Sequence, residues 1–140
     1  MNLCYLGVDI GYKRDTAAVA AVYRHREWNK FVLYDHMIWT PPVHIPHVTE
    51  SVIKFIETSR CGGVWFDPSQ WASESHRLAE LGYERLLREV NQQGEMVEFG
   101  NHLHGILSRN DFLRYEDAEI TAHFTGCAAE TTERGYRIVK

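Results

Sequence analysis

The stretch Tyr5-Leu6-Gly7-Val8-Asp9-Ile10-Gly11 is the segment around which we expect the fold to be organised. Apolar residues flank a single acid, and a glycine follows at once, which is typical of a buried central strand with a carboxylate near its end. A carboxylate in an apolar run costs on the order of several kcal/mol unless a cation or hydrogen bonds compensate it. Asp9 is therefore either an acid that caps a turn or part of a functional site.

A second stretch, Gly62-Gly63-Val64-Trp65-Phe66-Asp67-Pro68-Ser69, repeats this design. Glycines precede a short apolar strand, an acid follows it, and proline then interrupts the pattern. In open α/β sheets, ligands gather at the carboxyl ends of neighbouring strands. Two adjacent strands that end in Asp9 and Asp67 would bring together the oxygen ligands that Mg²⁺ and Mn²⁺ prefer.

The composition is that of one globular domain. The chain has 140 residues, of which 44% are hydrophobic, and no apolar run approaches the roughly 20 residues that cross a bilayer. No basic segment precedes the first apolar run, so we expect no signal peptide, no membrane association and a cytoplasmic location. The three cysteines form no C-x-x-C pair, which argues against a structural zinc site.

The formal net charge of −4 counts mildly against nucleic-acid binding. It does not exclude a metal-dependent nuclease, because such an enzyme must itself carry carboxylates.

The first half of the chain predicts a meander followed by a crossover. Residues 3–10, 16–23 and 31–39 are three strand patterns with short connections, which indicates an antiparallel meander. Apolar residues at helical spacing predict a helix over residues 47–59, before the strand that ends in Asp67. A strand, a helix and a strand imply a right-handed parallel crossover, which would seat the Asp67 strand beside the Asp9 strand.

The second half reads as alternating helices and strands. We expect a helix after Pro68, with Ser69 as its N-cap. The remaining expected segments are helical residues 84–90, a strand over 95–99, helical residues 106–124 and a final edge strand over 136–140.

The order β-β-β-α-β-α-β-α, with acids on the first and fourth strands, resembles the ribonuclease-H-like fold. This α/β fold has a mixed sheet in which three antiparallel strands are followed by parallel strands, with helices on both faces. We expect one such domain over residues 1–140.

Within that fold, the residues resemble the nuclease domain of the large terminase subunit of phages and prophages. The first motif is Gly7-Val8-Asp9-Ile10-Gly11-Tyr12-Lys13-Arg14-Asp15-Thr16-Ala17-Ala18-Val19, and the second is Val64-Trp65-Phe66-Asp67-Pro68. The tail segments 119–124 and 134–140 are also similar to the part that these domains carry after their last long helix. The resemblance covers nearly the whole chain.

The resemblance implies a metal-dependent endonuclease that cuts concatemeric double-stranded DNA during packaging in the bacterial host cell. Asp9 and Asp67 would be the catalytic acids, and would bind two Mg²⁺ or Mn²⁺ ions. The implied partners are double-stranded DNA, the terminase ATPase domain, the small terminase subunit and the portal. Lys13 and Arg14, on the turn after the Asp9 strand, are candidate contacts to DNA phosphates.

One departure from the family pattern matters. The family carries a third acid on a helix after the final strand, and this sequence reaches Lys140 before any such helix. We therefore expect the domain to lack that helix and one face of its sheet to be partly uncovered, which favours self-association. The sequence contains no G-x-x-x-x-G-K-[S/T] motif, so we expect no ATPase domain in this chain.

Two alternatives stay open. The chain could be a truncated, non-catalytic terminase fragment that docks onto DNA or a motor domain. Alternatively, Val8-Asp9-Ile10-Gly11 followed by Thr16-Ala17 is similar to the first phosphate loop of sugar kinases and actin-like ATPases. Those folds need a second glycine motif and a duplicated domain, and this sequence has neither. Binding of ATP by the isolated chain would discriminate between these alternatives.

Overall fold

A computed structural model describes residues 2–11, 16–90, 108–109, 112–115, 128–132 and 135–139. Its centre is the predicted antiparallel meander, formed by β1 (Cys4–Ile10), β2 (Ala17–His25) and β3 (Lys30–Trp39). Buried and exposed residues alternate strictly along β1, as expected for a strand with one covered face. The alanine-rich β2 is a strand because it pairs along its whole length between β1 and β3.

The predicted crossover is confirmed, and it places β4 (Cys61–Phe66) parallel to β1. The register between the two strands shifts by one residue: Cys4 faces Cys61, Tyr5 faces Gly63, and Gly62 has no partner on β1. A short strand, β5 (Leu87–Glu89), continues the sheet beside β4, and β6 (Phe112–Leu113) pairs with β3 at the other edge. The sheet order is β5-β4-β1-β2-β3-β6, an α/β mixed sheet consistent with the ribonuclease-H-like fold.

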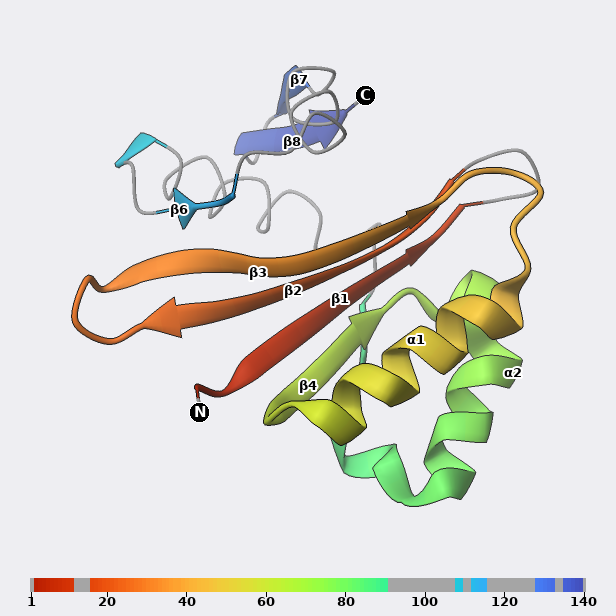
Figure 1. Ribbon diagram of the computed structural model, residues 1–140. Helices are drawn as coiled ribbons and strands as arrows, with labels where there is room; N and C mark the ends of the chain where they lie inside the picture. Colours follow the sequence, from red (N-terminus) through yellow and green to blue (C-terminus); the bar gives the residue numbers. More distant parts are fainter. Residues whose placement is uncertain are drawn as a thin grey trace.

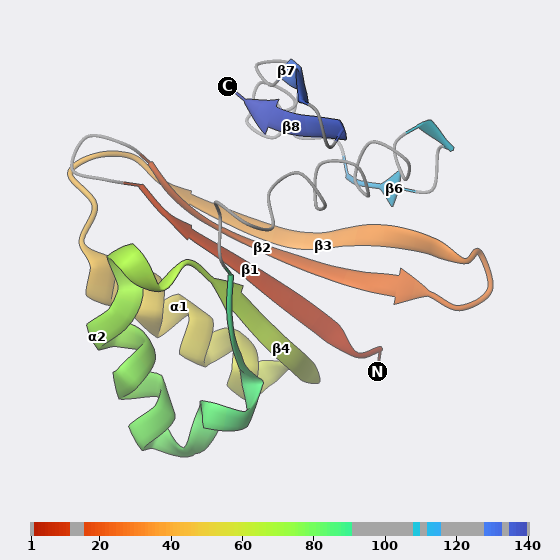
Figure 2. The same cartoon turned by 180° about the vertical axis from the view of Figure 1, so that it is seen from behind.

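Helices α1 (Ile45–Thr58) and α2 (Pro68–Leu78) cover the same face of this sheet (Figures 1 and 2). Their apolar residues and the inward residues of β1, β2 and β4 form one core. The most buried side chains of that core include Leu6, Val19, Val48, Val52, Val64, Trp71 and Leu78. We call the opposite face of β1, β2 and β4 the open face; it carries the alternate residues of these strands.

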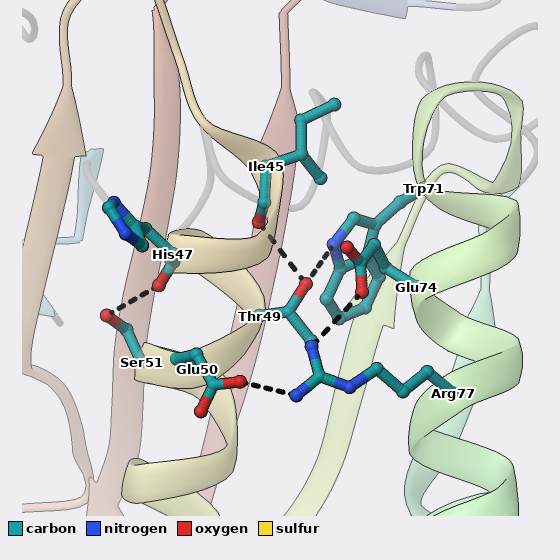
Figure 3. Close-up of polar contacts among 8 residues, drawn as sticks. All are labelled: Ile45, His47, Thr49, Glu50, Ser51, Trp71, Glu74 and Arg77. Carbon is teal, nitrogen blue, oxygen red and sulfur yellow. Dashed lines mark hydrogen bonds and ion pairs between the residues drawn. The ribbon is translucent and has the colours of Figure 1, made fainter.

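A buried polar contact fixes α2 against α1 (Figure 3). The indole Nε1 of Trp71 donates to the Thr49 hydroxyl at 3.2 Å, and that hydroxyl donates to the Ile45 carbonyl at 3.3 Å. At the surface, Arg77 on α2 forms an ion pair with Glu50 on α1. Since α2 begins directly after β4, these contacts also hold the strand-to-helix junction in place.

Several predicted elements differ from the structure. The expected helix over 84–90 is wrong: a π-turn (Ala79–Tyr83) with Gly82 at φ 98° leads into a single 3-10 turn, and β5 follows. Leu87 pairs with Val64 of β4, so sheet pairing overrides the local helical spacing. Within residues 106–124, where we expected one or two helices, Phe112–Leu113 form β6 instead, and the strand expected over 95–99 lies outside the described residues.

The final strand is confirmed as β8 (Gly135–Val139), which pairs with β7 (Ala128–Thr132), a strand we did not predict. The two described helices cover one face of the sheet, and most residues of the helix expected on the second face lie outside the described ranges. In the part of the chain that the structure describes, no helix has the length and apolar character needed to span a membrane.

Candidate metal-binding site

Asp9 and Asp67 lie side by side at the carboxyl ends of two parallel strands. The pairing of β1 with β4 runs to Val8 and Phe66, and the next residue along each segment is an aspartate. Adjacent strands are about 4.8 Å apart, so the two carboxylates can share one ion. Asp9 is exposed and alternates with the buried Val8, while Asp67 is half-buried and follows the buried Phe66. Both side chains therefore belong to the open face.

Asp67 also caps α2. Its Oδ1 accepts a hydrogen bond from the backbone N–H of Ser69 at 2.9 Å, and its own backbone is extended (φ −85°, ψ 120°). The prediction that Ser69 is the N-cap is therefore wrong. The reason is local: Pro68 occupies the first helical position, where its fixed φ fits, so the cap is the residue before it. One carboxylate oxygen is thus fixed by the helix and the other is available to a ligand.

The open face beside the two acids carries aromatic residues. The rings of Tyr5 and Trp65 meet edge to face with centroids 5.6 Å apart, and the residues are 38% and 36% exposed. Glycines make room for them: a Cβ at Gly62 would approach Tyr5 to 2.8 Å, and one at Gly63 would approach Trp65 to 2.5 Å. Trp65 lies two residues before Asp67, and this spacing along β4 places it on the open face and not in the core.

No cation compensates either acid in the described part of the chain. Neither Asp9 nor Asp67 forms an ion pair there, and no group of three or more His, Cys, Asp or Glu residues gathers among the described residues. Lys13 and Arg14, the predicted phosphate contacts, fall outside the described ranges. The donor set is thus two carboxylates. This fits Mg²⁺, which commonly uses one or two carboxylates and completes its shell with water and substrate phosphates.

The opposite ends of the same two strands carry thiols. Cys4 on β1 faces Cys61 on β4, and burial raises the pKa of both side chains. A raised pKa keeps a thiol protonated, which lowers its affinity for metals and its nucleophilicity. The acid end of the strands, and not the thiol end, is therefore the candidate metal site.

Comparisons with known proteins agree on the fold. No family model matches the sequence, and no curated protein matches it. Among solved structures, the large terminase of bacteriophage HK97 matches with a TM-score of 0.81 at 13% identity, over 98% of this chain and 35% of that one. The chain thus spans about a third of the length of that protein.

Two isolated nuclease domains match over more of their own length. The manganese-bound large terminase nuclease domain of bacteriophage SPP1 gives a TM-score of 0.69 at 16% identity, over 99% of this chain and 78% of that one. The large terminase nuclease of thermophilic phage G20c gives 0.70 at 12% identity, over 99% and 74%. A further structure of the G20c nuclease contains magnesium. The chain described here therefore has the fold of the nuclease domain of phage large terminases.

Proposed function

We propose that this chain is a divalent-metal-dependent DNA endonuclease domain of a phage or prophage terminase, which hydrolyses double-stranded DNA. The observation that carries the proposal is the Asp9–Asp67 pair: two carboxylates at the same level of adjacent parallel strands, without a cation among the described residues. The fold supports the choice of substrate, because the matching structures are large terminases and their nuclease domains.

Asp9 and Asp67 would together hold Mg²⁺ or Mn²⁺. When bound, such ions lower the pKa of water and neutralise charge on phosphoryl oxygens, and two of them stabilise both the attacking and the leaving oxygen. Asp9 is exposed and makes no hydrogen bond within the described residues, so its carboxylate would be available as a metal ligand. Asp67 has one oxygen held by the Ser69 N–H, so it presents its second oxygen in a fixed orientation. A fixed ligand is the protein's contribution to positioning the phosphate.

The wider role is a proposal of the same kind. A domain with this activity would cut concatemeric DNA in the bacterial cytoplasm. It would work with the terminase ATPase domain, the small subunit and the portal, and a third acid would complete a two-ion site. A non-catalytic, DNA-docking fragment is the second candidate, favoured by the fact that only two candidate ligands gather among the described residues.

Calorimetric titration with Mn²⁺, with plasmid nicking followed in parallel, tests this function. The wild-type chain is expected to bind Mn²⁺ saturably and to nick supercoiled plasmid, and Asp9→Ala and Asp67→Asn are expected to lose both properties. Asp67→Asn is the sharper variant, because asparagine keeps the helix cap and removes only the charge.

Glu57→Gln is the matched control, because it removes one negative charge from an exposed position on α1. That helix packs on the face of the sheet opposite to the two acids. Mn²⁺ binding without nicking in the wild type would favour the docking fragment. Nicking retained in Asp9→Ala would overturn the proposal.

A further inference from the structure

A depression lies on the open face, at the end of β1 opposite to Asp9. It has a volume of about 420 Å³ and is lined by Asn2, Leu3, Tyr5, Arg24, Arg26 and Asn29. Among the described residues, two arginines and no acidic residue line it. The nearest acid in the sequence, Glu27, is on the same turn but does not line the depression.

Arg24 is preorganised for a bidentate ligand. Its Nε and one terminal nitrogen both donate to the side-chain oxygen of Asn29, at 3.0 and 2.5 Å, and its guanidinium lies 5.5 Å from the Phe31 ring centroid. Asn29 has the left-handed backbone that asparagine tolerates (φ 49°). The remaining N–H groups of the guanidinium make no hydrogen bond within the described residues, and its planar fork matches the geometry of phosphate oxygens.

Arg26 is exposed and makes no ion pair or hydrogen bond within the described residues. The turn that carries it is held by its neighbours: the Trp28 N–H donates to the His25 ring at 3.2 Å, and the two rings stack 3.9 Å apart. A free guanidinium on a fixed turn is therefore available beside the held one.

The arginines and the acids share one face. Arg24 continues the series of alternate β2 residues that lie on the open face. In the same series, Val22 pairs with Tyr5 and Ala18 pairs with Asp9. From the level of Leu3 to Asp9 the strand rises by about 20 Å. Between them the surface has open space at Gly7, where a Cβ would meet no atom within 4 Å, and the β2 residues beside Gly7 and Asp9 are alanines; the exposed rings of Tyr5 and Trp65 flank this space.

We propose that the Arg24–Arg26 depression binds a backbone phosphate of the same DNA duplex whose scissile phosphate lies at Asp9 and Asp67. At about 3.4 Å per base pair, the two contacts would be separated by about six base pairs if the duplex runs along β1. We choose a DNA phosphate over an acidic protein segment because the depression shares its face with Asp9 and Asp67, where the proposed function places the scissile phosphate. The proposal rests on the proposed nuclease function and adds where the substrate is held.

The test is fluorescence anisotropy of a labelled DNA duplex titrated with the chain in EDTA, over a series of KCl concentrations. Without divalent ions the acid pair cannot hold the DNA through a metal, so the contribution of the arginines is measured without it. Arg26→Ala is expected to weaken binding about fivefold to tenfold and to reduce the slope of log affinity against log salt by about 1, the loss of one phosphate contact. Asn29→Gly, which suits the left-handed turn but releases Arg24, is expected to give a smaller loss.

Lys54→Ala is the matched control, because it also removes one positive charge, from an exposed position on α1. That helix packs on the face of the sheet opposite to the two arginines. It is expected to leave the slope unchanged, and circular dichroism of each variant confirms that the sheet is intact. Wild-type affinity and slope in Arg26→Ala, an equal effect of Lys54→Ala, or absence of wild-type binding would each overturn the inference.

Competition by poly-glutamate as strong as that by unlabelled DNA of equal charge would point to an acidic protein partner instead, and would also overturn it. The nuclease proposal is judged separately, by Mn²⁺-dependent nicking. An unchanged Arg26→Ala slope together with active wild-type nicking would reject the anchor alone. Nicking retained in Asp9→Ala, together with the expected Arg26→Ala slope, would reject the nuclease alone.

Discussion

At the scale of single residues, Asp9 carries the charge whose removal is most informative. Its carboxylate lies one strand away from that of Asp67, and no cation pairs with either within the described residues. Two like charges about 5 Å apart repel by up to about 1 kcal/mol in a solvent-like environment. This repulsion lowers the free energy of unfolding of the metal-free protein.

We expect Asp9→Asn to raise the metal-free unfolding temperature by about 1–3 °C, because it removes this repulsion. The same variant should lose the stabilisation that saturating Mn²⁺ gives the wild type, since only the folded state holds the paired acids. Differential scanning fluorimetry with EDTA and with Mn²⁺ measures both effects. Glu57→Gln should change neither, and a lower metal-free midpoint for Asp9→Asn would contradict the reasoning.

At the scale of elements, the junction between β4 and α2 joins the fold to the site, because Asp67 ends one element and caps the next. We expect Asp67→Ala to lower the free energy of unfolding by about 1 kcal/mol through loss of the cap. Asp67→Asn should lower it by only about a few tenths of a kcal/mol. Ser69→Ala should stay within about 0.5 kcal/mol, because its backbone N–H is retained. Urea denaturation measures all three, and equal losses for the alanine and asparagine variants of Asp67 would show that the cap contributes nothing.

Local sequence patterns predicted these elements unequally. The meander and α1 follow from periodicity, and the neighbourhood of Asp9 and Asp67 follows from crossover topology, so both were predictable. The segment 84–90 was not, because its helical spacing is overridden by pairing with β4. The N-cap of α2 is Asp67, two residues before the predicted Ser69. The general preference for serine at N-caps does not include the constraint that Pro68 imposes on the first helical position. The basic depression was missed because its arginines meet Tyr5 only when the sheet forms.

At the scale of the whole molecule, the open face combines exposed apolar side chains with both charged sites. Leu3, Tyr5 and Trp65 are each more than a third exposed on it. We expect reversible self-association through this face at high concentration, visible as a concentration-dependent sedimentation coefficient. Trp65→Ser should weaken the association, and duplex DNA should compete with it because both use one surface. A coefficient that stays constant with concentration would count against this expectation.

The extra residue in β4 determines where along the chain an insertion or a deletion can be accepted. Gly62 lies unpaired at the start of the strand, so the alignment of the two aspartates is set from Gly63 onward. A residue gained or lost in the loop before Cys61 can be absorbed at this bulge, and both carboxylates then keep their level and their face. A residue gained or lost between Gly63 and Asp67 moves that aspartate to the other side of the sheet. Length variation is thus tolerated before Gly62, whereas length variation after Gly62 separates the two aspartates.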